Sequence, residues 1–256
     1  LGLPILLILA FVDPTEVNAE PRWIKPIKFF ISIGLYNLTL EWIYRVFRTD
    51  QNGVQLNWIR RVIAVGMLVE AVLIVTQAGR GLQSHFNVAT ALDALIFMTM
   101  AVAITIVVLA VFFSGFLVWK ARSLSPPMFA EAIIYGVLLM TLASFQGFVM
   151  TEATPQQVSA IERGEEPGIE GSHFVGEPPA VGHRTVPFAG WSLDVGDLRI
   201  AHFIGLHSLQ FLLGLAFALH RLKVAAPLLI IRVSALLYSG LFVYAFLRAQ
   251  AGLFLI

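Results

Sequence analysis

Five side chains with ligand-binding chemistry lie close to two short motifs in this chain of 256 residues. Arg80, His85 and Asp93 lie in and just after the stretch GRGLQSHFN, and His202 and His207 follow the stretch GWSLDVGDLR. A neutral imidazole ligates zinc, copper or haem iron and can relay protons. We therefore expect these five residues to line a polar site for a metal or a small molecule.

The spacing of the two later histidines limits the metal-binding alternatives. His202 and His207 are five residues apart, about 140° around a regular helix, so they can chelate one ion only if the helix breaks near Gly205. Otherwise a zinc site needs one of them together with His85 and Asp93. One haem b held by His85 and His207 is a further alternative. The same residues can instead form a hydrogen-bonded cluster that holds an outer loop in place.

Three carboxylates lie within apolar runs, where an ionisable group is costly and therefore a functional candidate. Glu41 is one turn from Arg45, about 6 Å from the edge of its run. Glu70 and Asp93 lie about 12–13 Å inside the next two runs. The three acids predict a path for protons or cations across a membrane. The alternative is three separate acids, each protonated or hydrogen-bonded to a neighbouring helix.

The composition indicates an integral membrane protein. Hydrophobic residues make up 58% of the chain and charged residues 13%, about half the usual globular share. This excludes a soluble enzyme and a disordered chain, and the net charge of +1 provides no field that attracts nucleic acid. The lipid bilayer is the partner that we expect, together with a small-molecule ligand. The absence of cysteine excludes disulfides and thiolate metal sites.

The elements that must position these groups are helices, because a bilayer span needs about 20 mostly apolar residues. We predict an all-α bundle that forms one transmembrane domain over residues 1–256. Six apolar segments are long enough to span a bilayer: 27–47, 58–79, 87–118, 129–150, 199–220 and 225–247.

The stretch 1–12 is a seventh candidate, although at about 18 Å it is too short to cross. We interpret it as the end of a truncated or short first helix, which makes seven spans. The alternative is a signal-peptide core followed by a small-residue cleavage motif at residues 17–19.

The basic residues predict the orientation, because cytoplasmic loops carry the excess of Lys and Arg. Eight of them lie in loops 45–61, 119–128 and 221–224, against five on the other side. The N-terminus is therefore expected in the cytoplasm. Trp23, Lys25 and Lys28 are interpreted as an interfacial anchor.

The longest connection, residues 151–198, then lies on the extracytoplasmic face. Loops of this length without periodicity are usually functional or disordered. We expect its second part, 186–198, to cover the polar site as a cap. Small residues within the spans, Gly136 and Gly214 among them, predict close helix approach.

Three stretches resemble a group of bacterial multipass membrane proteins. They are PRWIKPIKF from Pro21, RGLQSHFN from Arg80, and GWSLDVGDLR from Gly190 running into HFIGLH. The resemblance covers most of the chain. It implies a bacterial inner membrane and nothing catalytic.

A second resemblance is to the seven-helix zinc hydrolases related to alkaline ceramidases and adiponectin receptors, which combine Ser, Asp and three His. Ser84, His85, Asp93, His202 and His207 are the same residue types, although the paired histidines are five rather than four apart. This resemblance implies a metal-activated water that attacks a lipid amide or ester. The function classes that stay open are a receptor or carrier, this hydrolase, a proton-coupled transporter and a b-type haem protein.

Overall fold

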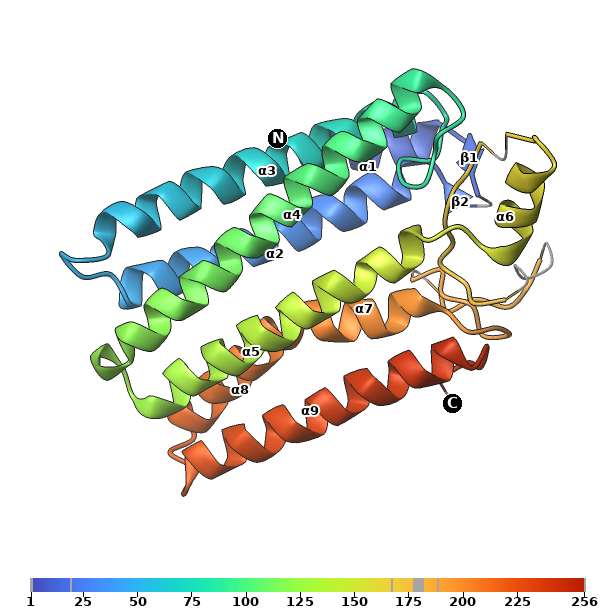
Figure 1. Ribbon diagram of the computed structural model, residues 1–256. Helices are drawn as coiled ribbons and strands as arrows, with labels where there is room; N and C mark the ends of the chain where they lie inside the picture. Colours follow the sequence, from blue (N-terminus) through green and yellow to red (C-terminus); the bar gives the residue numbers. More distant parts are fainter. Residues whose placement is uncertain (1, 19, 167, 177–181, 188, 256) are drawn as a thin grey trace. The chain divides into compact units, whose positions relative to one another are not determined.

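The computed structural model describes residues 2–18, 20–166, 168–176, 182–187 and 189–255, and the chain is mainly α-helical (Figure 1). Ala19, the last residue of the alternative cleavage motif, lies outside the described residues. In chain order the elements are α1 (Gly2–Val12), β1 (Glu16–Val17), β2 (Glu20–Pro21), α2 (Ile24–Val46), α3 (Gly53–Gly79), α4 (Ala91–Lys120), η1 (Arg122–Leu124), α5 (Pro127–Gln146), η2 (Gly147–Thr151), α6 (Pro155–Glu162), α7 (Leu198–Leu206), α8 (Ser208–Arg221) and α9 (Pro227–Gln250).

Among the described residues, four helices are long and apolar enough to cross a membrane, or five if the bent pair α7 and α8 is one span. Three of the four are α3, α4 and α9, and the fourth is the run Pro127–Glu162, which comprises α5, η2 and α6. The all-α class agrees with the prediction, but seven spans are not confirmed. Helix α1 has 11 residues, and α2 interrupts its apolar run with polar residues such as Asn37 and Glu41.

The outer surface of the long helices is apolar, as lipid contact requires. On α4, large hydrophobic side chains are exposed at helical spacing: Leu95, Met98, Val102, Ile106 and Leu109. Thr99 and Thr105 donate their hydroxyl protons to carbonyls four residues earlier, so these side chains satisfy their hydrogen bonds within the helix. An apolar patch of this extent marks an interaction with protein or membrane. These helices therefore fit a chain embedded in lipid.

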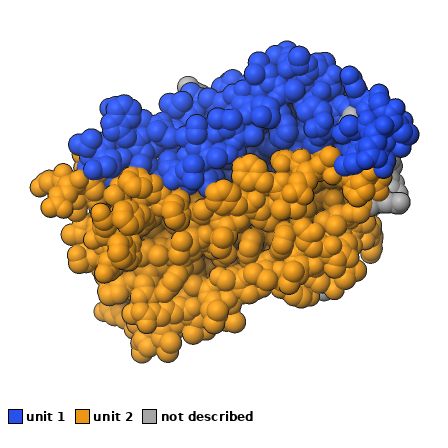
Figure 2. Space-filling view, in the orientation of Figure 1, with its two compact units in different colours: residues 1–45, 53–110, 157–170 blue, residues 46–52, 111–156, 171–256 orange. Residues whose placement is uncertain are grey.

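The described chain divides into two compact units (Figure 2). Unit 1 comprises residues 1–45, 53–110 and 157–170, and unit 2 comprises residues 46–52, 111–156 and 171–256. The two units share the long helix α4, whose residues up to Ala110 belong to unit 1.

In unit 1, helix α3 packs against α1, α2 and α4. Ala78 of α3 lies in a buried cluster with Leu6 and Trp23, and Ile74 lies in a second cluster with α4 residues. The absence of a side chain at Gly66 lets Val107 of α4 approach the α3 backbone closely. The end of α3 and the start of α4 are thereby held together around the turn 80–90.

In unit 2, helix α5 packs along α7 and α8, and α9 packs against both α5 and α7 (Figure 1). A Cβ atom added at Gly136 would lie 2.6 Å from the Cα atom of Leu209, so only glycine permits this approach of α5 and α8. Ser208 donates a hydrogen bond of 2.9 Å to the Gly136 carbonyl. Proline at the start of α5 and α9 fits the first turn, where its missing N–H has no intrahelical partner.

Candidate functional site

The five predicted site residues fall into two groups. Arg80, His85 and Asp93 belong to unit 1, whereas His202 and His207 belong to unit 2. That the two groups join in one site stays a prediction, and the contacts within each unit indicate what each group can do.

Asp93 is the centre of a saturated network at the first turn of α4. Its carboxylate, 2% exposed, accepts hydrogen bonds from Arg80 (2.5 Å), Gln77 (3.0 Å) and Thr90 (2.6 Å). Arg80 also donates to the side-chain carbonyl of Gln77. Because buried charges are costly unless paired and hydrogen-bonded, this network fixes the turn between α3 and α4. Asp93 and Arg80 therefore have a positioning role that accounts for their contacts.

His85 lies beside a residue that the sequence suggested only as an interfacial anchor. The Nζ atom of Lys25, in the first turn of α2, is 3.1 Å from Nδ1 of His85. The buried hydroxyl of Ser84 is also 3.1 Å from this nitrogen. With Lys25 protonated, the imidazole must accept at Nδ1, because an ammonium only donates. Its hydrogen is then on Nε2, so the Lys25 ammonium and the His85 ring are both N–H donors.

Three phenylalanine rings from three different elements surround His85. The ring centroids of Phe29, Phe86 and Phe97 lie 6.1, 6.2 and 6.4 Å from that of the imidazole. The Lys25 ammonium lies 6.0 Å from the centre of the Phe29 ring, at the outer range of a cation–π contact. The cluster therefore combines a cation and an imidazole with an aromatic wall.

The turn that carries His85 has an unusual backbone. Phe86 has a φ of +65°, a conformation that bulky residues rarely adopt. Residues 168–170 of the long loop support it, because Glu170 donates its N–H to the Phe86 carbonyl and Val88 donates to Gly168. Strain of this kind clusters at functional sites, where the surroundings hold it in place.

Two of the three predicted path acids, Glu41 and Asp93, form ion pairs with arginines of unit 1. Glu41 accepts hydrogen bonds from Arg45 (2.7 Å) and Arg60 (2.8 Å) at one end of α2. Glu70 is 4% exposed in the middle of α3. Glu70 and the Asp93 partner Gln77 are seven residues apart, about 10 Å along α3. A continuous path between the acids stays a prediction.

In unit 2, His207 lies at the break between α7 and α8, whose axes differ by 43°. The spacing of His202 and His207 allows them to chelate one ion only if the helix breaks near Gly205. The Nδ1 of His202 donates a hydrogen bond of 2.8 Å to the Ala143 carbonyl, and the centroid of the His207 ring lies 4.2 Å from that of the Phe203 ring. The first contact joins α7 to α5, and the second holds the His207 ring against α7.

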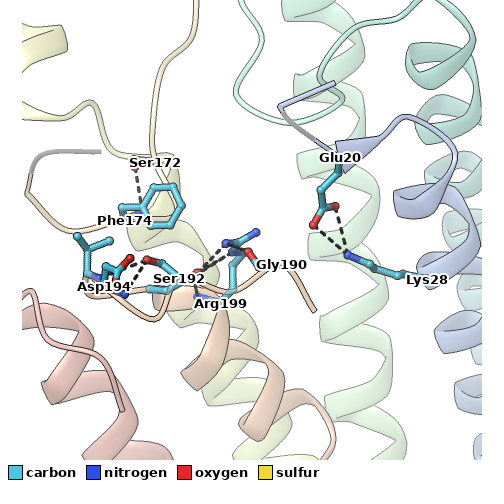
Figure 3. A network of polar contacts seen from close by, with 10 residues as sticks. Glu20, Lys28, Ser172, Phe174, Gly190, Ser192, Asp194 and Arg199 are labelled. Carbon is cyan, nitrogen blue, oxygen red and sulfur yellow. Dashed lines mark hydrogen bonds and ion pairs between the residues drawn. The ribbon is translucent and has the colours of Figure 1, made fainter. Parts of the chain in front are cut away.

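The second motif, GWSLDVGDLR at residues 190–199, forms a network of hydrogen bonds at the start of α7. Asp197, 1% exposed, accepts hydrogen bonds from the Ser192 N–H and from the backbone and guanidinium of Arg199. Arg199 also donates to the Gly190 carbonyl (Figure 3). The hydrogen bonds from Arg184 lower the pKa of Asp194. The motif therefore folds residues 190–199 onto the N-cap of α7.

The same segment packs against the helices of unit 2. Trp191 contacts the cluster that contains Ala143 and Phe242, and its ring lies 5.1 Å from Phe203. Residues 157–170 of the long connection belong to unit 1, and they contain most of α6 and the residues that pair with the turn 86–88. That residues 151–198 face the extracytoplasmic side stays a prediction.

Within the described ranges, no three His, Asp or Glu side chains are grouped closely enough to hold a metal ion. Two hollows lie elsewhere, one between α2 and α3 and one between α5 and α9, and neither is lined by the five predicted residues. The sequence analysis did not identify Gln77 as a partner of Asp93 or Lys25 as a neighbour of His85. The recurrence of polar residues Glu70 and Gln77 at a spacing of seven on one apolar helix is a signal that could have identified Gln77.

Comparison of this chain with protein-family models, curated proteins and solved structures finds no match.

Proposed function

We propose that this chain is a multipass membrane protein that binds a small molecule with an anionic oxygen and an apolar body at Lys25 and His85. The observation that carries the proposal is the contact of 3.1 Å between Lys25 Nζ and His85 Nδ1 within a wall of three phenylalanines. Two N–H donors suit a carboxylate or similar oxygen, because charge-assisted hydrogen bonds are the stronger ones. Aromatic side chains are typical linings of small-molecule sites.

The same contact favours an anion over a metal. An ammonium next to His85 repels a cation at that imidazole, and repulsion between unit charges is strong where water is scarce. The zinc hydrolase and the b-type haem protein both require a metal bound near His85. They are therefore less favoured than a receptor or carrier of an organic anion.

A matched set of variants tests the proposal. Octanoate and octylammonium are titrated by calorimetry against the protein in lipid nanodiscs, with partition into protein-free nanodiscs subtracted. Octanoate should bind in preference to octylammonium, and Lys25→Gln and His85→Gln should each weaken it by about tenfold or more. Lys28→Gln is the control, because Lys28 lies one turn further along α2 and pairs with Glu20 (Figure 3). Equal binding of the two probes would refute the proposal.

Proton-coupled transport is the second candidate, and the burial of Glu70 in the middle of the apolar helix α3 favours it. Buried acids within transmembrane helices are typical of proton relays. A pH-sensitive dye enclosed in liposomes would report proton flux through the protein. Glu70→Gln should abolish this flux, and unaltered flux would exclude Glu70 from the path.

The topology is part of the proposal. Seven spans, a cytoplasmic N-terminus and a bacterial inner membrane are supported by the apolar segments, the loop charges and the resemblance described above. The chain contains no cysteine, so single cysteines placed in the loops give an unambiguous accessibility map. Labelling of a cysteine at Gln51 from the periplasmic side would overturn the predicted orientation.

A further inference from the structure

The hollow between α2 and α3 in unit 1 combines an apolar wall with a charged end. Its volume is about 540 Å³, within the range of small-molecule sites. Its apolar lining comes from both helices: Leu38, Leu40, Ile63 and Ala64. At Gly34 an added Cβ atom would meet nothing within 4 Å, so the groove is open along α2.

The charged end of the groove has an excess of positive charge. Glu41 is a single carboxylate between two guanidinium groups, those of Arg45 and Arg60. The Nε atom of Arg60 is buried and has no hydrogen-bond partner among the described residues. An unsatisfied buried donor is costly, so an additional acceptor at this position would stabilise the protein.

The second hollow, between α5 and α9 in unit 2, has a similar ion pair but balanced charge. Glu131 accepts hydrogen bonds from both Nε (2.8 Å) and Nη2 (2.6 Å) of Arg232. The volume of this hollow is about 330 Å³, and its lining includes Leu138 and Leu236. One acid and one base leave no net charge here, so this hollow provides a matched comparison within the same chain.

We infer that the α2–α3 groove binds an anionic phospholipid. The phosphate group accepts hydrogen bonds from Arg60 and Arg45, and an acyl chain lies along Leu38 and Ile63. Guanidinium groups match the geometry of phosphate oxygens, and basic pockets between transmembrane helices bind anionic head groups. The apolar wall selects a lipid over a free phosphate ion. The balanced groove at Arg232 does not discriminate between anionic and zwitterionic lipids.

Native mass spectrometry of the full chain, released from nanodiscs of equimolar phosphatidylglycerol and phosphatidylcholine with identical acyl chains, tests this inference. Wild-type protein should retain phosphatidylglycerol, and Arg60→Gln should reduce its retention by about tenfold. Arg232→Gln should leave the lipid ratio unchanged. Gly34→Leu, which fills open space without a clash, should displace the lipid while the fold is preserved.

Four results would overturn the inference. The first two are equal retention of the two lipids by wild type and an unchanged lipid ratio in Arg60→Gln. The other two are full retention of phosphatidylglycerol in Gly34→Leu and an effect of Arg232→Gln as large as that of Arg60→Gln.

A further arm of the experiment adds inorganic phosphate at millimolar concentration. If phosphate alone displaces phosphatidylglycerol, the site recognises the ion and not the lipid. Failure here does not affect the octanoate experiment, because Lys25 and His85 do not line this groove.

Discussion

The ammonium of Lys25 lies 3.1 Å from the Nδ1 atom of His85, sixty residues further along the chain. This contact connects the first turn of α2 to the turn between α3 and α4. It places a cation, an imidazole and three aromatic rings at one end of unit 1. The saturated Asp93 network beside it holds the same turn in place.

Asp93→Ala should strongly destabilise the fold. It leaves the guanidinium of Arg80 and the fully buried amide of Gln77 without their acceptor. Loss of one partner of a buried ion pair costs about 3 kcal/mol, which corresponds to a fall in Tm of roughly 6–12 °C. Circular dichroism during heating in detergent measures it. Glu165→Gln, in the exposed pair with Arg163, is the control and should change Tm by less than about 2 °C. A fall in Tm no larger than that of the control would contradict the positioning role of Asp93.

Gly136→Ala should separate α5 from α8, because the new methyl group would lie 2.6 Å from the Leu209 Cα atom. Overpacking of this kind costs about 1–3 kcal/mol. Gly214→Ala is the matched control, since nothing lies within 4 Å of its added Cβ, and it should stabilise α8 by up to about 1 kcal/mol. Unfolding of both variants by denaturant measures the change in the free energy of unfolding that each causes. The same loss in both would show that glycine at position 136 is not needed for packing.

The stability of the chain should depend on pH through Asp13. Hydrogen bonds from Thr15 and Trp23, with the guanidinium of Arg22, hold the pKa of this carboxyl well below its ordinary value. A lowered folded-state pKa contributes stability that is fully present above the unfolded value of about 3.9 and is lost as the pH falls further. The difference in Tm between wild type and Asp13→Asn should therefore be constant from pH 8 to pH 5 and narrow below pH 4. A difference that is undiminished at pH 3 would contradict this assignment.

The helical elements could be predicted because apolar runs of 20 residues have few alternatives. The predicted segments 58–79 and 225–247 lie within α3 and α9 to within a few residues. The number of spans could not be settled in this way. Helix α2 is long enough to span a bilayer, but its polar residues Asn37 and Glu41 lower its hydropathy. Glu41 forms ion pairs at the α2–α3 groove.

The contacts of the site were less predictable, because they join residues far apart in the sequence. Lys25 has the composition and position of an interfacial anchor, and only tertiary packing places it beside His85. Both Gly136 and Gly214 were interpreted from the sequence as positions of close helix approach. Of the two, only Gly136 faces a neighbouring backbone. Residue type alone does not say which side of a helix meets a partner when all sides are apolar.

The hydrogen position on His85 tests the central claim most directly. Protein labelled with ¹⁵N in its histidine rings is reconstituted in lipid, and the His85 signals are assigned by their loss in His85→Gln. Lys25 should donate to Nδ1, so Nδ1 should be unprotonated and Nε2 protonated, and Lys25→Met should shift the Nδ1 resonance while Lys28→Met does not. A protonated Nδ1 in wild type, or an Nδ1 resonance unmoved by Lys25→Met, would contradict the donor pair from which the proposed ligand site is built.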